Sequence, residues 1–194
     1  VTEDQERVAN ILRWNSYEGW DTAVSQYNIY RGVDGVFDFL NVYKTIVPDK
    51  EGEHEFVDRI LNESSSLGTY CYVVEAIEGP VKPELASFIT SATSKSNYAC
   101  GDMEPIFYIP NAFSPSGLNK VFRPEGQFFD YKYYEMVVYN RWGEKIFETR
   151  DFFEGWDGTH NGKEAQDGTY VYTIRFKDAA GKEHSKKGTV TLLR

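Results

Sequence analysis

The stretch TYVYTIRFKD, residues 169–178, alternates apolar and polar side chains with a period of two. In an extended chain this pattern places four large apolar side chains on one face, namely Tyr170, Tyr172, Ile174 and Phe176. Strict alternation of this kind predicts a β-strand with one buried face. No helical periodicity of any length occurs elsewhere in the sequence, so the chain is expected to be built from strands.

Similar short segments recur along the whole chain, separated by turn-forming residues. The 13 Phe, 14 Tyr and 4 Trp among 194 residues favour strands, and the 16 Gly and 7 Pro favour frequent turns. We predict an all-β fold of two tandem immunoglobulin-like antiparallel β-sandwiches. The expected strands are 7–14, 23–32, 36–46, 54–60, 68–79 and 86–100, followed by 106–113, 121–124, 132–143, 144–149, 169–178 and 182–194.

The charge changes sharply near residue 104. Residues 1–104 hold 8 basic and 18 acidic side chains, whereas residues 105–194 hold 13 and 12. Such a shift suggests a domain boundary, and we place the domains at 1–102 and 103–194, joined by the short linker GDMEP (101–105). The acidic first half argues against a nucleic-acid partner.

No apolar run approaches the roughly 20 residues that span a bilayer. The first residues, VTEDQERVAN, have neither the basic nor the apolar region of a signal peptide. The sequence is therefore either cytosolic or a piece of a longer secreted protein.

The two cysteines, Cys71 and Cys100, lie on either side of the proline-rich segment PVKPEL (80–85). Folding the chain at that segment brings the two residues face to face across an antiparallel pair of strands. We predict a Cys71–Cys100 disulfide and an oxidising compartment. The alternative is a pair of unrelated buried thiols.

The residues suggest no catalytic constellation and no cofactor. The three histidines, His54, His160 and His184, lack the spacing of a zinc site, and no serine sits in a nucleophile elbow. The best metal candidate is DGTHNG (157–162), which resembles the start of a calcium loop. Gly168 stands where that loop needs glutamate. We therefore expect no metal and interpret the segment as a connection between strands, with calcium near Asp157 left open.

Three motifs in the second half carry a family resemblance: IPNAFSPSGLNKVF (109–122), MVVYNRWGEKIFET (136–149) and the stretch from WDGTHNG (156–162) to the end. Residues 105–194 resemble the gliding motility-associated C-terminal domain, the type B sorting domain of the type IX secretion system. The family usually has an acidic loop at the first motif. Here Lys120 stands among neutral residues, so we expect no cation at that corner and interpret it as a rigid turn around Gly117.

The resemblance implies a sorting signal for secretion rather than an enzyme. The partners it implies are the type IX translocon, a PorP/SprF-like outer-membrane barrel protein and an attached N-terminal cargo region. The cargo would cross the periplasm of a Gram-negative bacterium and reach the cell surface or the medium.

Residues 5–100 resemble a fibronectin type III module through Trp14, the segment 27–31 and Tyr70, which occupies a tyrosine-corner position. The leading strand of such a module is not evident, so we expect the sequence to begin inside it. Two alternative functions stay open: an extracellular module that binds carbohydrate or protein, and a structural spacer.

The final segment is the candidate recognition element for the translocon. If it forms a sheet edge, its backbone can accept an added strand, and its basic residues can steer an acidic partner. The predicted recognition residues are Lys186, Lys187, Gly188, Thr189, Val190, Thr191, Leu192, Leu193 and Arg194. Two tryptophans, Trp142 and Trp156, are predicted to lie in the core of the same domain.

Overall fold

The computed structural model describes residues 8–49, 52–60, 67–79 and 91–194, and these residues form strands and turns with no helix. The chain divides into two compact units, the first ending at Met103 and the second running from Glu104 to Arg194. The all-β fold class is confirmed in both units, and the strand pairs are antiparallel except for the parallel pair β10–β17. The domain boundary proposed from charge falls one residue before the division between the units.

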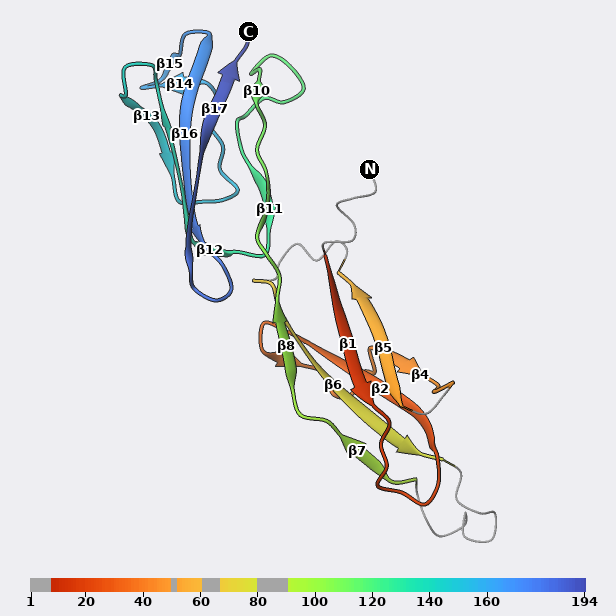
Figure 1. The fold of residues 1–194 in the computed structure, drawn as a ribbon. Coiled ribbons are helices and arrows are strands. Elements are labelled where there is room, and N and C mark those ends of the chain that lie inside the picture. The colour runs from red at the N-terminus through yellow and green to blue at the C-terminus, as the bar shows by residue number, and fades with distance from the viewer. Residues whose placement is uncertain (1–7, 50–51, 61–66, 80–90) are drawn as a thin grey trace. The chain divides into compact units, whose positions relative to one another are not determined.

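The N-terminal unit contains two antiparallel sheets (Figure 1). One pairs β1 with β5, and the other follows the order β3-β2-β6-β7, with β4 also on β2 and β8 also on β6. The strands are β1 (Ala9–Asn15), β2 (Val24–Val33), β3 (Val36–Phe37), β4 (Lys44–Ile46), β5 (Glu53–Arg59), β6 (Thr69–Glu78), β7 (Thr93–Lys95) and β8 (Ala99–Asp102).

The predicted disulfide is confirmed. Cys71 on β6 lies directly opposite Cys100 on β8, and the two sulfur atoms are bonded. The strand expected at 86–100 is interrupted, since β7 and β8 are separate within it and residues 86–90 lie outside the described residues, as does the predicted PVKPEL loop. The register shifts by one residue between the two strands, since Glu75 lies opposite Lys95 on β7 whereas Cys71 lies opposite Cys100 on β8.

The strand expected over 36–46 is wrong as a single element. The Asp38 carboxylate accepts hydrogen bonds from the Leu40 backbone N–H (2.9 Å) and the Asn41 side chain (2.6 Å). This local turn competes with extended pairing, and the segment breaks into the short strands β3 and β4.

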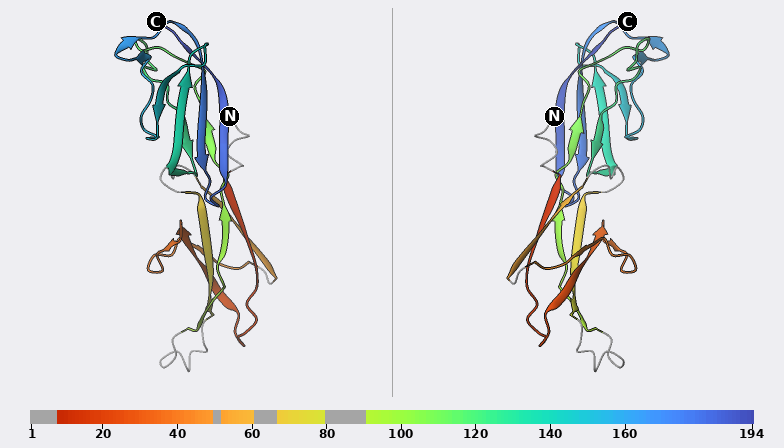
Figure 2. Two further views of the ribbon diagram at one scale, coloured as in Figure 1. Left: turned by 90° about the vertical axis from the view of Figure 1, so that its left-hand side faces the viewer. Right: turned by 90° about the vertical axis from the view of Figure 1, so that its right-hand side faces the viewer.

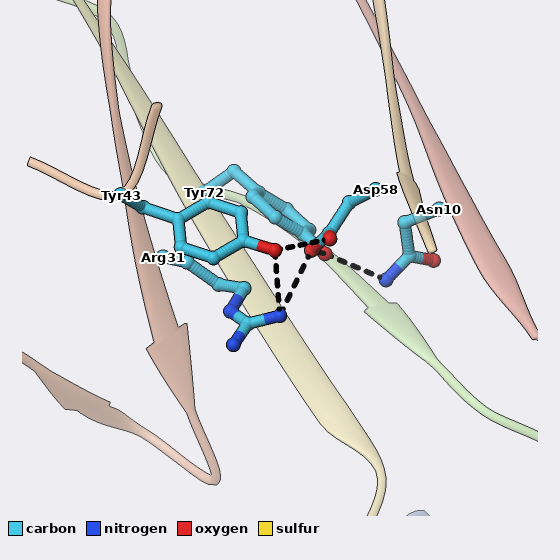
Figure 3. A network of polar contacts seen from close by, with 5 residues as sticks. All are labelled: Asn10, Arg31, Tyr43, Asp58 and Tyr72. Atoms are coloured by element: carbon cyan, nitrogen blue, oxygen red, sulfur yellow. Dashed lines mark hydrogen bonds and ion pairs between the residues drawn. The ribbon is translucent and has the colours of Figure 1, made fainter. Parts of the chain in front are cut away.

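A polar network lies in the interior of the N-terminal unit (Figure 3). The buried Asp58 carboxylate accepts hydrogen bonds from the hydroxyls of Tyr43 (2.5 Å) and Tyr72 (2.7 Å), and Arg31 pairs with it at 3.2 Å. Asn10 on β1 donates to the Tyr72 hydroxyl at 3.0 Å. Burial raises the pKa of the Tyr72 hydroxyl well above its ordinary value. The network joins the two sheets because β1 and β5 belong to one and β2 and β6 to the other.

The C-terminal unit is built on a five-stranded sheet in the order β10-β17-β16-β12-β13. The long strands β12, β16 and β17 run alongside one another in both views of Figure 2. Smaller antiparallel pairs are β9–β11 and β14–β15. The strands are β9 (Ile106–Tyr108), β10 (Ala112–Phe113), β11 (Glu125–Gln127), β12 (Asp130–Tyr139), β13 (Lys145–Thr149), β14 (Thr159–His160), β15 (Lys163–Glu164), β16 (Gly168–Lys177) and β17 (Glu183–Leu192).

The core of this unit is dominated by aromatic side chains. The apolar face predicted for 169–178 is buried as expected, and Phe107 of β9 packs against it, with its ring centroid 4.4 Å from that of Phe176. Trp156 is fully buried, and its indole N–H donates to the Thr159 carbonyl at 2.8 Å. The prediction for Trp142 is wrong: this side chain is 72% exposed on the β12–β13 turn, with the Arg141 guanidinium 4.2 Å from its ring centroid.

Candidate recognition surface of the C-terminal unit

The final strand, β17, has one fully paired side and one largely open side. It pairs with β16 antiparallel along all ten residues, from Glu183 to Leu192. On its other side, among the residues that the structure describes, only the two-residue strand β10 pairs with it, in parallel, at Thr191 and Leu192. Figure 1 shows β10 beside the C-terminal end of β17. The predicted recognition element is therefore an edge strand along most of its length.

Two backbone hydrogen bonds fix which groups face the open side. The Thr191 N–H donates to the Asn111 carbonyl (2.9 Å), and the Leu193 N–H donates to the Phe113 carbonyl (3.0 Å). Because the backbone alternates along a strand, the N–H and C=O groups of Lys187 and Thr189 point the same way. In the described part of the chain no strand pairs with them. The edge is thus covered from Thr191 onward, and the open part lies upstream of Thr191.

Three of the nine predicted recognition residues pack inside the unit. Val190 and Leu192 are fully buried, as their alternation with the threonines predicted. Gly188 lies under the Tyr172 ring on β16, and an added Cβ would fall 2.4 Å from the Tyr172 hydroxyl oxygen. These three positions pack against the rest of the unit and are not available for contact with a partner.

The two adjacent lysines project to opposite faces of the sheet. Lys187 lies opposite Thr173 on the outer face, and the Lys186 ammonium approaches the Phe107 ring at 5.9 Å on the other. Both side chains are exposed, and neither forms an ion pair with any described residue. They supply unneutralised positive charge beside the open edge.

Arg194 has a structural role that the sequence did not reveal. Its guanidinium donates to the carbonyls of Gly158 (3.0 Å) and Ala165 (2.8 Å) and pairs with Glu164 at 3.2 Å. These contacts tie the end of the chain to the connection between β13 and β16. No local pattern indicates them, because the accepting carbonyls lie about thirty residues upstream.

The calcium candidate at 157–162 forms a compact hairpin. Asn161 and Gly162 have positive φ values of 51° and 72° and connect β14 to β15, as an Asn-Gly turn does. The Asp157 carboxylate accepts from the N–H (2.9 Å) and hydroxyl (2.7 Å) of Thr159. Among the described residues, no group of three acidic, histidine or cysteine side chains is placed to hold a metal.

The corner at 109–122 is closed by its own backbone. The Ser114 N–H donates to the Asn119 carbonyl (2.9 Å), and the Gly117 N–H donates to the Ser114 carbonyl (2.9 Å). Phe113 and Phe122 on its two sides are buried around Trp156, to which Phe122 is bridged. The corner therefore anchors β10 against the end of β17.

The described residues include no helix long and apolar enough to cross a membrane. Residues 107–192 match the family model of the CHU_C type IX secretion signal domain. No curated protein matches the chain significantly. Among solved structures, one titled for fibronectin(III)-like modules of CbhA from Clostridium thermocellum matches with 10% identity, over 94% of this chain and 84% of that one. Its TM-score of 0.26 supports no conclusion about the present fold.

Proposed function

We propose that the folded C-terminal unit, in which residues 107–192 match the CHU_C type IX secretion signal domain, directs an attached cargo through the type IX translocon to the cell surface or the medium. The match to the signal-domain family carries this proposal. A secretion signal is a non-catalytic kind of domain, so the function proposed for the chain is sorting rather than catalysis. The cargo would lie N-terminal to the unit and pass through the periplasm of a Gram-negative bacterium.

We further propose that the translocon recognises the open edge of β17. The N–H and C=O groups of Lys187 and Thr189 offer unpaired positions for strand addition, the mode by which an extended segment extends an exposed sheet. The charges of Lys186 and Lys187 would orient an acidic partner before docking. A PorP/SprF-like outer-membrane protein with an acidic extended segment is the partner that this surface suits.

Export of a reporter tests the sorting function. A fluorescent protein that is delivered to the periplasm is fused to the N-terminal end of residues 1–194 and expressed with and without a functional translocon. We expect fluorescence outside the outer membrane only when the translocon is present. Retention of the fusion in the periplasm of competent cells would contradict the proposal.

Two variants of one residue separate edge recognition from folding. Lys187→Pro removes an N–H that points to the open side and leaves the bonds to β16 intact, since a proline is tolerated at such an edge position. Lys187→Ala keeps that N–H and removes only the charge. We expect Lys187→Pro to abolish export and Lys187→Ala to weaken it, with both domains folded. Equal export of the two variants would exclude strand addition at this position.

The N-terminal unit supports a second candidate function, carbohydrate or protein binding outside the cell. The rings of Phe39 and Tyr98, 40% and 62% exposed, both contact the ring of Phe37 on β3. Lys95 lies over the Phe39 ring at 4.9 Å. Exposed aromatic rings beside a charged group can stack on a sugar ring. Selective binding on a glycan array that is lost in Tyr98→Ala would favour this function.

A further inference from the structure

Three segments of the C-terminal unit emerge at the same end of its sheet. The β12–β13 turn follows Tyr139, where β12 pairs with the first half of β16. The last residues follow Leu192, which lies opposite Gly168, the first residue of β16. The corner leaves β10 at Phe113, beside Leu192. Figure 1 shows the turn, the corner and the C-terminus at one end of the unit. We call this the loop end, and its segments are 114–120, 140–144 and 193–194.

Each of the three segments carries one strongly exposed apolar side chain. Trp142 and Leu193 are more than half exposed, and Leu118 is fully exposed. Single exposed apolar residues are common on protein surfaces. Here three of them gather at one end of one unit, and an indole is among the largest apolar surfaces that a side chain offers. The loop end therefore presents three apolar tips to its surroundings.

Hydrogen bonds hold these tips outward. The Asn140 side-chain oxygen accepts from the N–H groups of Trp142 and Glu144 (both 3.0 Å), and its amide nitrogen donates to the Glu144 carboxylate (2.8 Å). The corner that carries Leu118 is closed by its own backbone hydrogen bonds, and the Leu193 N–H is bonded to β10. A side chain displayed on a fixed backbone loses less conformational entropy when it is buried against a binding surface.

Basic side chains accompany the tips. The Arg141 guanidinium lies over the Trp142 ring, 4.2 Å from its centroid, and Lys120 follows Leu118 by two residues. Neither cation forms an ion pair with any residue that the structure describes. The basic residues of the three segments are Lys120, Arg141 and Arg194, and the acidic one is Glu144. An apolar tip beside an unneutralised cation suits an anionic lipid surface, since the tip enters the headgroup region and the cation approaches a phosphate.

We propose that the loop end binds an anionic lipid surface. Trp142, Leu118 and Leu193 lie among the headgroups, with Arg141 and Lys120 beside lipid phosphates. The indole suits this position because its amphipathic ring is favoured at the boundary between membrane and water. The inference goes beyond the proposed function and does not depend on it, because binding to lipid needs no translocon.

The shape of the loop end favours lipid over a protein partner. The three apolar side chains project from separate segments, and no part of the Leu118 side chain is covered. A folded partner would need a matching hollow for each tip, whereas lipid headgroups rearrange around tips of any spacing. The open edge of β17 lies upstream of Thr191, farther along the sheet. A unit that rests on a membrane by its loop end therefore keeps that edge accessible.

Sedimentation with vesicles tests the proposal. Purified residues 1–194 are mixed with vesicles of equal parts phosphatidylethanolamine and phosphatidylglycerol, and separately with vesicles of phosphatidylcholine alone. We expect binding to the anionic vesicles at millimolar lipid and weaker binding to the neutral ones. Added salt should reduce this difference, because it screens the cations from the phosphates. Tryptophan emission should shift to the blue on binding, because the Trp142 ring leaves water.

Matched substitutions locate the bound surface. Trp142→Ala should lower the vesicle partition coefficient at least about tenfold, which is the effect of losing a buried aromatic side chain, and should remove the blue shift. Tyr133→Ala removes another exposed aromatic ring, in the first half of β12, and should leave partition unchanged. Arg141→Glu should weaken binding to the anionic vesicles and leave binding to phosphatidylcholine unchanged. Thermal unfolding verifies that each variant is folded.

Three results would overturn the proposal. The first is that the unaltered protein does not sediment with anionic vesicles. The second is equal partition of the unaltered protein and Trp142→Ala. The third is loss of reporter export in Trp142→Ala without any binding to vesicles, which would assign the loop end to a protein partner. The vesicles contain no translocon, so a failure of lipid binding is distinct from a failure of export, which the reporter measures alone.

Discussion

The two units differ in how their end strands are closed. In the C-terminal unit the end of β17 is clamped by β10, and Arg194 ties the last residue to the Gly158 and Ala165 carbonyls. In the N-terminal unit β1 has no strand on its outer edge among the described residues, and its inward side chains are half-buried. In the C-terminal unit, the two-residue strand β10 and Arg194 close the end of the last strand. In the N-terminal unit, a hollow remains along β1.

The largest expected effect is in the C-terminal core, where closure depends on packing. Trp156→Ala should destabilise this unit by about 3–5 kcal/mol, because it leaves a cavity between Phe113 and Tyr170. The matched control is Trp142→Ala, which should cost less than about 0.5 kcal/mol because that side chain is exposed. Thermal unfolding followed by NMR resolves the two units. Comparable losses from the two substitutions would show that burial does not determine stability here.

The next effect is in the N-terminal unit, where a disulfide joins β6 to β8. Replacement of both Cys71 and Cys100 by alanine should lower its free energy of unfolding by about 2–4 kcal/mol, since the disulfide closes a long loop in the unfolded chain. Denaturant unfolding of the variant measures the loss. The C-terminal unit has no cysteine, so its transition should not move. A variant with unchanged N-terminal stability would mean that the bond between β6 and β8 adds nothing beyond the pairing of these two strands.

The elements that could be predicted are those whose determinants are local. The alternation in 169–178 predicts β16 because one face of that strand is buried against the core. The positions of Cys71 and Cys100 about a proline-rich loop predict their register because antiparallel pairing is symmetric about its turn. In both cases the pattern itself contains the physical cause.

The features that escaped prediction depend on distant contacts or on side-chain competition. Arg194 is held by carbonyls far upstream, and the cover over the end of β17 comes from Asn111 to Phe113. The segment 36–46 has the composition of a strand, but the Asp38 carboxylate bends it. Trp142 follows Asn140, whose side chain accepts the Trp142 N–H and shapes a turn that leaves the indole outside.

A moderate effect is expected from loosening the closure of β17. Arg194→Ala should destabilise the C-terminal unit by about 1.5–3 kcal/mol, because the carbonyls of Gly158 and Ala165 lose a charged donor. Arg194→Lys keeps the charge but not the forked geometry, and should recover only part of the loss. Differential scanning calorimetry measures both. If Arg194→Ala leaves stability intact and still prevents export, Arg194 acts in recognition and not in closure.

The smallest effect concerns pH and the turn between β16 and β17. The Asp178 carboxylate accepts a hydrogen bond from His184 (2.7 Å) and another from the Lys182 N–H (2.9 Å), which lower its pKa below the ordinary 3.8. A carboxyl group with a lowered pKa in the folded state stabilises the fold above its ordinary pKa, and this contribution is lost as the pH falls through the folded value. Asp178→Asn should therefore flatten the acid limb of the C-terminal stability curve, by less than about 1 kcal/mol. The N-terminal transition, followed in the same pH titration, is the reference. A parallel acid loss in the variant would place the pH sensitivity in other carboxylates of the C-terminal unit instead of at this turn.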